Sequence, residues 1–423
     1  MSCLAALVTA CGGAPSKEAA PPAATPSASA SAEARPKSPA DAPATDEEAR
    51  KVIEQALAHV AEVRKLAPKT PVKGVVISRE ALLERIKKDL LVDLEPDLIE
   101  GTKELLFALN LTRADFDYFA NLLLLYGTQL AGFYDPQQKE MVLLDDLGVD
   151  AQEATLWHEL VHALQDQNYD LQKLTKWSPE HGDQVSAVQS LAEGDATSAM
   201  MDVMLLPRGQ RALDVPEAIF AQGIAAIEAL PEVANVPSIL KRSIVAPYTD
   251  GLTFTHALRR EGDWASVDAA WQKPPETTEQ LLHPEKYRAH ERAETVPLPP
   301  APPGGPATVR YRDVLGEQTI RLVLEEWVPL DTAKKAASGW AGDRVAVFAD
   351  GDRRAVAIGL RYDDEASAKR ALEAVARGAA SDPVENPTGV RSATTEVGQK
   401  AGRAGRFCAE RDLRGPFAVV RSG

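Results

Sequence analysis

Cysteine is rare in this chain, whose 423 residues include only three. Cys3 and Cys11 stand at the N-terminal end, so the sequence holds no disulfide framework of the kind that stabilises small secreted scaffolds. The third, Cys408, has no base beside it, and we expect it to be a plain core residue rather than a nucleophile.

Clustered positive charge is also missing. The formal net charge is −15, and no run of lysine and arginine stands out. Because nucleic-acid binding requires a basic patch, we expect no nucleic-acid partner. Apolar residues make up 44% and charged residues 26% of the chain, which is typical of a globular protein with a sizeable core.

The N-terminal end resembles a bacterial export signal. The apolar run from Leu4 to Ala10 is far too short to span a bilayer. It ends at Val8-Thr9-Ala10-Cys11, which resembles a lipobox, where a lipid is attached to the cysteine. A signal peptide requires a positively charged segment before its apolar run, and none precedes Leu4. A disordered alanine-rich start with a chance cysteine is therefore the alternative. We expect residues 1–11 to be a lipoprotein signal, Cys11 the lipidation site, and the protein extracytoplasmic and lipid-anchored to the bacterial cell envelope.

Domain boundaries follow from composition. Residues 12–45 are rich in alanine, proline and serine, and too poor in apolar surface to offset the entropy of ordering, so they are expected to be a disordered tether. From Asp46, apolar residues recur at three- and four-residue steps, as in amphipathic helices. We assign the main domain to 46–297, a proline- and glycine-rich linker to 298–306, and a small unit to 307–423.

Within the main domain we predict several helices and one hairpin. Ser78 and Thr112 are candidate N-caps of two helices, the second of which runs to about Leu125. The stretch 130–144 contains two apolar, β-prone runs separated by an Asp-Pro turn, which predicts a β-hairpin. That hairpin either lines a substrate cleft and pairs with an extended peptide, or is an ordinary part of the core.

One helix carries a metal-binding motif. Asp150 is a candidate N-cap for a helix over about 151–168, which contains His158-Glu159-Leu160-Val161-His162. Four residues are slightly more than one helical turn, so both imidazoles project from one face and can hold Zn²⁺ at about 2.0–2.1 Å. Glu159 can then act as the base that takes a proton from a water and passes it to the leaving amine.

A catalytic zinc usually has three protein ligands, so a third must come from elsewhere. Glu193 is the preferred candidate, because it lies on a second apolar helix, whereas His181 lies in a polar, loop-like stretch. Asp195 is a further alternative for the third ligand. Zinc-bound histidines donate their second N–H to an outer partner, and both Asp166 and Asp195 are candidates for that position.

Several separated segments, read together, resemble a family of poorly characterised bacterial and archaeal gluzincin-like zinc metallopeptidases, which are often exported. The resemblance extends from about Val72 to Tyr287 and continues more weakly into the C-terminal part. Its segments are Ala131-Gly132-Phe133-Tyr134-Asp135-Pro136, His158-Glu159-Leu160-Val161-His162-Ala163-Leu164-Gln165-Asp166-Gln167, Glu193-Gly194-Asp195-Ala196, Pro247-Tyr248-Thr249-Asp250-Gly251 and the stretch 274–287.

The resemblance implies a zincin-like fold with His158, His162 and Glu193 on zinc and Glu159 as the base. A tyrosine or histidine often stabilises the oxyanion at such a site, which makes Tyr248 and His283 candidates. Tyr248 precedes Gly251, where we expect a turn. For His283 the alternative is that its proline-rich segment packs a loop on the core, and His256 is expected to be a core or surface residue.

The C-terminal unit shows both periodicities. Helical spacing is predicted over 314–327 and 364–376, and paired strands over 344–348 and 355–362, with a possible last strand at 417–420. We therefore expect an α+β protein, made of a mainly helical metallopeptidase domain with a small β-hairpin or sheet and a small C-terminal α+β unit for packing or guiding substrate.

Three functions compete. The leading one is hydrolysis of peptide bonds in a peptide or protein outside the cytoplasm. The second is a non-catalytic zinc-binding lipoprotein for binding or envelope assembly, and the third is hydrolysis of cell-wall peptides by the same chemistry. A purely structural zinc site would be closed by four ligands and would not need Glu159, which favours the two enzymes. The sequence indicates neither a substrate preference nor an oligomeric state.

Overall fold

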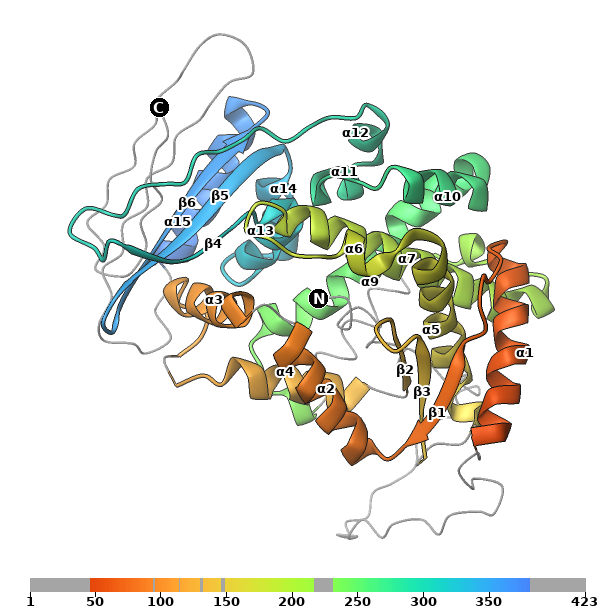
Figure 1. Cartoon of the computed structure of the whole chain (residues 1–423). Coiled ribbons are helices and arrows are strands. Elements are labelled where there is room, and N and C mark those ends of the chain that lie inside the picture. Colours follow the sequence, from red (N-terminus) through yellow and green to blue (C-terminus); the bar gives the residue numbers. More distant parts are fainter. Residues whose placement is uncertain are drawn as a thin grey trace, which may run out of the picture.

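The computed structural model describes six stretches of the chain, which together form an α+β fold with a three-stranded sheet at each end of a helical middle part (Figure 1). The expected lipoprotein signal, the lipidation site Cys11, the tether, Cys408 and the possible last strand lie outside them. The described residues are 46–93, 96–113, 115–129, 132–145, 149–216 and 231–380.

The first sheet contains the expected hairpin. β2 (Gly132–Asp135) runs antiparallel to β3 (Glu140–Leu144), and the Asp135 carboxylate accepts hydrogen bonds from backbone N–H groups in the turn. The unexpected element is β1 (Lys73–Ile77), which pairs in parallel with β3, so the order is β1-β3-β2. The central β3 is buried along its length, and β1 and β2 form the two edges of this sheet.

Four helices precede or flank this sheet. Ser78 caps α2 as predicted, because its hydroxyl accepts from Ala81 N at 3.1 Å. The prediction for Thr112 is wrong: the helix begins six residues later, and Asp117 caps it by accepting from Ala120 N at 2.9 Å. The carboxylate of Asp117 is the stronger cap acceptor. The helices are α1 (Asp46–Arg64), α2 (Arg79–Asp93), α3 (Pro96–Ala108) and α4 (Tyr118–Gln129).

Long helices fill the middle of the molecule. The motif helix α5 (Val149–Tyr169) packs on α7 (Gly182–Leu205), and α7 packs along α9 (Ser238–Gly262). No helix in the described residues combines the length and apolar character that a membrane crossing requires. The shorter pieces are α6 (Leu171–Leu174), η2 (Leu206–Arg208), η3 (Ala212–Asp214), η4 (Pro231–Val233), α10 (Trp264–Gln272), α11 (Thr278–Leu282) and α12 (Pro284–Arg288).

The C-terminal unit forms the second sheet and its helices. The two predicted strands and both predicted helices are present, and β4 is an additional strand that the sequence analysis missed. The sheet order is β4-β5-β6, antiparallel throughout. The elements are β4 (Thr308–Asp313), α13 (Gly316–Glu325), α14 (Leu330–Ala337), β5 (Trp340–Asp350), β6 (Arg353–Tyr362) and α15 (Glu365–Ala380).

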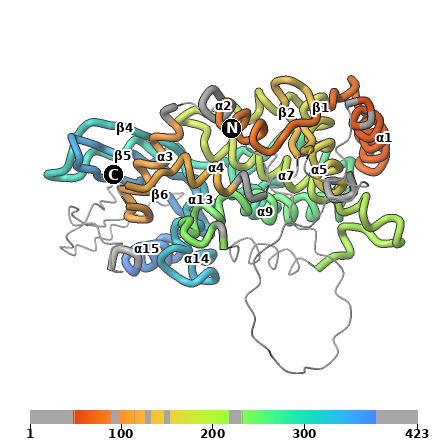
Figure 2. Tube along the Cα trace, turned by 90° about the horizontal axis from the view of Figure 1, so that it is seen from below, coloured from red at the N-terminus to blue at the C-terminus, as the bar shows by residue number. Residues whose placement is uncertain are grey.

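One apolar core joins this unit to the main domain. A single cluster contains Leu105 of α3 and Leu122 of α4 together with Tyr311 of β4 and Trp340 of β5. Figure 2 shows α3 beside the β4–β6 sheet, far from α1 and β1 at the other end. A second cluster lies under α1, α5 and α7. Because the first core is continuous, the C-terminal unit is fixed to the helices in the middle of the molecule.

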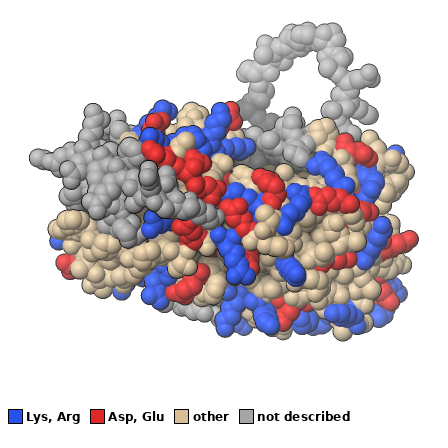
Figure 3. All heavy atoms as spheres, turned by 90° about the horizontal axis from the view of Figure 1, so that it is seen from above, with Lys and Arg blue, Asp and Glu red and all other residues tan. Residues whose placement is uncertain are grey.

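Lys286 makes a further connection to the unit. Its ammonium group lies among three carboxylates, from Glu279 at 2.5 Å, Glu291 at 3.2 Å, and Asp363, which follows β6. Burial opposes the charged form, but the carboxylates outweigh it and raise the pKa of Lys286. The face seen in Figure 3 otherwise mixes positive and negative side chains.

Buried acids also lie where the N-terminus of α7 meets the C-terminal unit. Asp183 accepts from Thr278 Oγ1 at 2.6 Å, and Asp343 accepts from the backbone of Gly316 at 2.8 Å. Burial raises the pKa of Asp183 to about 8, that of Asp343 to about 6 and that of Asp313 to about 7. This junction is therefore most stable when its carboxyl groups carry protons.

We expect the protein to lose stability as the pH rises from about 5 to 8. The Asp183 carboxyl group has a folded-state pKa above its unfolded value of 3.8, so its proton stabilises the fold. This stabilisation is complete below pH 3.8 and is lost as the pH rises through the folded-state pKa. Asp183→Asn should remove up to about 1.4 kcal/mol per pH unit, the limit for one proton, from the slope of unfolding free energy against pH. Urea unfolding at about pH 5.5, 6.5 and 7.5 measures that slope, because these values lie between the unfolded and the folded pKa of Asp183.

The exposed Asp115→Asn variant is the control for this measurement and should follow the wild-type slope. Part of the pH dependence of stability remains in both variants, because three other buried acids with raised pKa values are unchanged, namely Asp313, Asp343 and Glu279. An Asp183→Asn slope equal to that of the wild type would contradict the assignment of the buried proton to Asp183.

Candidate metal centre

Helix α5 carries both motif histidines into the interior. His158 is fully buried and His162 is 3% exposed. Apolar side chains on the same helix, among them Leu160 and Leu164, pack into the second core and hold it against α1 and α7. The predicted helix is confirmed and spans Val149–Tyr169, so the imidazoles lie one turn apart on a rigid element. The prediction of Asp150 as its N-cap is wrong, because Asp150 lies within the first turn.

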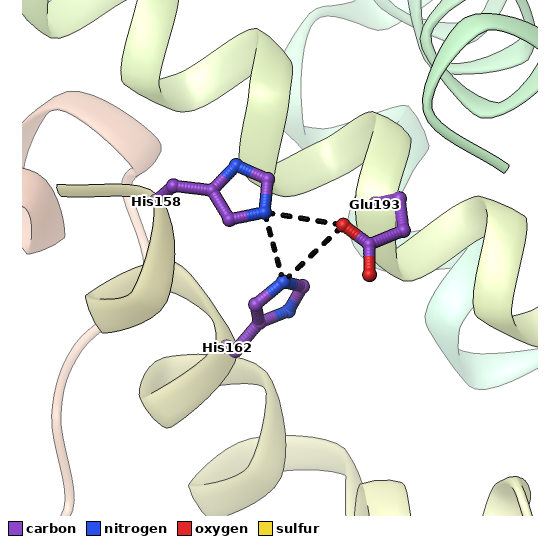
Figure 4. Close-up of side chains that lie close together, drawn as sticks. All are labelled: His158, His162 and Glu193. Atoms are coloured by element: carbon purple, nitrogen blue, oxygen red, sulfur yellow. Dashed lines mark hydrogen bonds and ion pairs between the residues drawn. The ribbon is translucent and has the colours of Figure 1, made fainter. Parts of the chain in front are cut away.

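Glu193 of α7 meets the two histidines. Its Oε2 is 3.1 Å from His158 Nε2 and 3.5 Å from His162 Nε2, and the two Nε2 atoms are 3.0 Å apart. All three side chains are buried, and Figure 4 shows them pointing toward one another. Of the three alternatives for the third position, Glu193 is the one that the structure brings to the histidines.

The spacing of these atoms fits a tetrahedral ion. Ligands bonded at 2.0–2.1 Å in a tetrahedron are separated by about 3.4 Å, close to the three observed separations. Glu193 Oε1 and Glu159 Oε1 are also buried without a hydrogen-bond partner in the described part of the chain. Buried polar atoms without partners are costly in a closed protein interior, so they favour a site built to receive an ion and a water.

Glu159 lies beside this group and is held at one oxygen only. Its Oε2 accepts a hydrogen bond from the backbone N–H of Tyr134 at 2.9 Å. That N–H belongs to edge strand β2, so the hairpin predicted from the sequence orients the carboxylate. Burial raises the pKa of Glu159 well above its ordinary value. The arrangement leaves Oε1 as the atom that can exchange a proton with a water.

The buried side chains of the site shift one another's pKa values. Burial opposes a charged His162, but the neighbouring Glu193 carboxylate outweighs it and raises the pKa of His162 to about 9. Burial lowers the pKa of His158 below its ordinary value. Burial acts against the Glu193 carboxylate, but His162 and His158 together lower its pKa below the ordinary value.

The residue that orients His162 is Gln165, which the sequence analysis missed. His162 Nδ1 lies 2.8 Å from Gln165 Oε1, and Gln165 Nε2 donates to Ala192 O and to Asp195 Oδ2 at 3.1 Å. Asp195 therefore acts on His162 through Gln165. Asp166 accepts instead from Tyr134 Oη and Lys139 Nζ, so it joins the motif helix to the hairpin and has no contact with His162 among these bonds.

Asp195 is itself anchored by a buried cation. Arg64 Nε donates to Asp195 at 2.5 Å, while the Arg64 Nη2 group donates to Asp268 at 2.7 Å. Both Arg64 and Asp195 are fully buried, and Trp271 Nε1 also donates to Asp195 at 2.9 Å. A chain of contacts thus extends from α1 through Asp195 and Gln165 to His162.

Tyr248 lies against the site from α9. Its ring stacks on that of His158, with centroids 5.7 Å apart and 25° between the planes. The prediction of a turn at Gly251 is wrong, because α9 continues through Pro247 and Gly251. The glycine serves a close helix crossing instead: a Cβ on Gly251 would lie 1.8 Å from Ser190 O, and one on Gly194 would lie 2.0 Å from Gly251 O. This crossing brings Tyr248 next to His158.

We expect Gly251→Ala to destabilise the protein by about 1–3 kcal/mol, because the new methyl group must push α7 and α9 apart. Gly262→Ala, at the end of the same helix, is the control, since its Cβ would meet only the movable end of Ser266. Urea unfolding measures both variants. Equal stability of the two would mean that the crossing tolerates a wider separation than the one described here.

Three further histidines contact residues other than His158, His162 and Glu193. His283 Nε2 is 2.9 Å from Glu317 Oε1, so this candidate for oxyanion stabilisation contacts the C-terminal unit. His181 is the exposed residue before α7, with Nδ1 2.8 Å from Ser178 Oγ. His256 is buried on α9, as a core residue, 3.1 Å from Ser198 Oγ.

Comparisons with known proteins match only the C-terminal part of the chain. A family model described as "Domain of unknown function (DUF8575)" matches residues 307–421, which include β4 to α15. No curated protein and no solved structure matches the chain. The chemistry of the metal centre therefore has to be inferred from its own residues.

Proposed function

We propose that this protein is a zinc-dependent metallopeptidase with a zincin-like main domain, which hydrolyses peptide bonds in peptides or proteins. The observation that carries the proposal is the meeting of three buried ligand atoms, all within 3.5 Å of one another, beside a carboxylate oxygen without a partner in the described residues. Two imidazoles and one carboxylate, with a fourth position open, are the donor set of catalytic zinc rather than of a closed structural site.

His158, His162 and Glu193 would hold the zinc. When bound, zinc supplies a lower pKa for a coordinated water and polarises a substrate carbonyl. Glu159 Oε1 takes the proton of the attacking water and delivers it to the leaving amine, while Tyr134 N–H holds Oε2 in place. Gln165 fixes the ring of His162, and burial of all these groups excludes bulk water.

Two further elements have roles in this proposal. Tyr248, stacked on His158, is the candidate that stabilises the oxyanion formed from the substrate carbonyl. Strand β2 is one of the two edge strands of its sheet, and its Tyr134 N–H donates a hydrogen bond to Glu159. An extended peptide can add to such an edge as a further strand, which would align its backbone with the base.

The site of action in this proposal is outside the cytoplasm, with Cys11 as the lipid anchor to the cell envelope. This rests on the lipobox-like sequence before Cys11. Labelling cells with a radioactive or clickable fatty acid tests it, since Cys11→Ser should remove the label from the protein. Hydrolysis of cell-wall peptides would use the same chemistry, so these peptides belong to the class of substrate proposed.

The deciding experiment measures bound zinc and peptide cleavage on the same purified protein. Elemental analysis should find about one zinc per chain, the stoichiometry of a single catalytic site, and unfolded casein should be cleaved. Zinc without cleavage of any peptide would favour a non-catalytic zinc-binding protein. A chain that binds no zinc, even after incubation with excess metal, would overturn the proposal.

A further inference from the structure

A cavity of about 250 Å³ adjoins the metal centre. Glu193 and Tyr248 form part of its wall, so the cavity starts at a ligand residue and at the proposed oxyanion residue. Along α7, the lining residues Gly182, Ser186, Gln189 and Glu193 follow one another at three- and four-residue steps. One face of α7 therefore forms a continuous wall that leads away from the metal centre.

The opposite wall belongs to the C-terminal unit. Val314, which follows β4, and Thr319 and Leu322 of α13 line the cavity. Apolar side chains of α3 and α4, including Leu105 and Leu122, complete it, and most of its lining is aliphatic or aromatic. The unit that matches a domain of unknown function thus contributes directly to the space beside the candidate site.

This second wall is tied to the site by charged contacts. Asp250 of α9 lies two residues after Tyr248 and accepts from Arg321 Nη2 and Gln318 Nε2 of α13, each at 2.8 Å. Arg321 and Asp250 are 10% and 14% exposed, so the pair is largely shielded from solvent. The distance between Tyr248 and the α13 wall is therefore held by a partly buried ion pair.

The size and chemistry of the cavity indicate its occupant. Sites for whole small molecules occupy about 300–1,000 Å³, so a cavity of 250 Å³ suits one large side chain rather than a complete ligand. The rings of Tyr118 and Trp177 add flat apolar surface to the aliphatic walls. The metal centre at one end would hold the scissile peptide bond of a substrate whose side chain enters the cavity.

We propose that this cavity binds one large apolar side chain, aromatic or long aliphatic, next to the scissile bond, and that the C-terminal unit sets this preference. The inference rests on the proposed peptidase function and extends it to the class of substrate. The C-terminal unit is then part of the substrate-binding site, and removing or reshaping its α13 wall changes which peptides are bound.

Binding of a matched peptide pair to the full-length Glu159→Gln protein tests the inference without cleavage. The probes are an N-acetylated pentapeptide with one phenylalanine among glycines and its twin with alanine in that place. Isothermal titration calorimetry should give roughly tenfold or more tighter binding of the phenylalanine peptide, because its ring is removed from water in the cavity. Adding Thr319→Trp fills the cavity and should reduce the preference to less than about twofold.

Thr332→Trp is the matched control, since Thr332 is a partly buried threonine on a helix of the same unit and does not line the cavity. It should keep the full preference. If Thr319→Trp fails to fold, as circular dichroism will reveal, Val314→Phe fills the cavity from another position and should have the same effect.

The outcomes separate this inference from the proposed function. If the wild type cleaves casein but the Glu159→Gln protein binds both peptides equally, the inference is overturned and the peptidase function stands. A preference for phenylalanine that survives both filling variants would overturn it as well. If the preference is present and disappears on filling, yet the wild type cleaves nothing, the cavity assignment stands and the peptidase function fails.

Discussion

Glu159→Gln is expected to lower kcat/KM for peptide cleavage by roughly 10²–10⁴-fold while zinc stays bound at about one per chain. The amide has nearly the same shape as the carboxylate and can still accept the hydrogen bond from Tyr134 N–H, so the site keeps its geometry. It cannot take a proton from water at neutral pH, and the general base is lost. A fluorogenic peptide assay and elemental analysis of the same sample measure the two quantities.

The control for this substitution lies on the same helix. Glu153 is exposed on α5, and Glu153→Gln makes the same chemical change about 1.7 turns earlier. It should keep wild-type activity and zinc content. A Glu159→Gln protein with full activity would show that another group is the base, whereas loss of zinc would assign Glu159 to metal binding.

Arg64→Ala should cost about 3–5 kcal/mol of stability, because it leaves the fully buried Asp195 carboxylate without its cation. Arg64 also bonds Asp268 and lies 4.7 Å from the ring of Trp264, so the truncation removes packing as well as charge. Urea unfolding at neutral pH measures the loss. Through Asp195 and Gln165, the orientation of His162 is weakened too, and zinc affinity is expected to fall roughly 10–100-fold.

Arg50→Ala, on the same helix α1, provides the comparison. Arg50 pairs with Glu47 at 3.0 Å, with both side chains more than half exposed. Exposed pairs contribute about 0–1 kcal/mol, so this variant should be close to the wild type. If the two variants are equally stable, the buried pair is no more important than a surface pair, and the chain from α1 to His162 has no energetic role.

The part of the candidate site that sequence predicts is the part set by local spacing. One helical turn brings His158 and His162 together. The hairpin is indicated by an Asp-Pro turn between two β-prone runs. Glu193 was predicted from the apolar character of its own helix, although its meeting with the histidines depends on how α5 packs on α7. These features need little knowledge of distant segments.

What sequence could not predict depends on long-range packing. Strand β1 pairs with β3 across more than sixty residues, and nothing in its own five residues indicates the partner. Gly251 suggests a turn when it is read alone, whereas its function is to let α9 approach α7. Gln165 has an amide that many helices carry on their surface, and only the positions of Ala192 and Asp195 make it the partner of His162.

The lysine at the junction of α12 with the C-terminal unit has a consequence for experiments with chelators. Glu279, Glu291 and Asp363 lie close enough together to hold a metal ion, but the Lys286 ammonium occupies the space among them. That cation is covalently part of the chain, so EDTA cannot extract it. The Lys286 contacts that attach the C-terminal unit therefore remain when EDTA is present. A loss of peptidase activity in EDTA would then report on His158, His162 and Glu193.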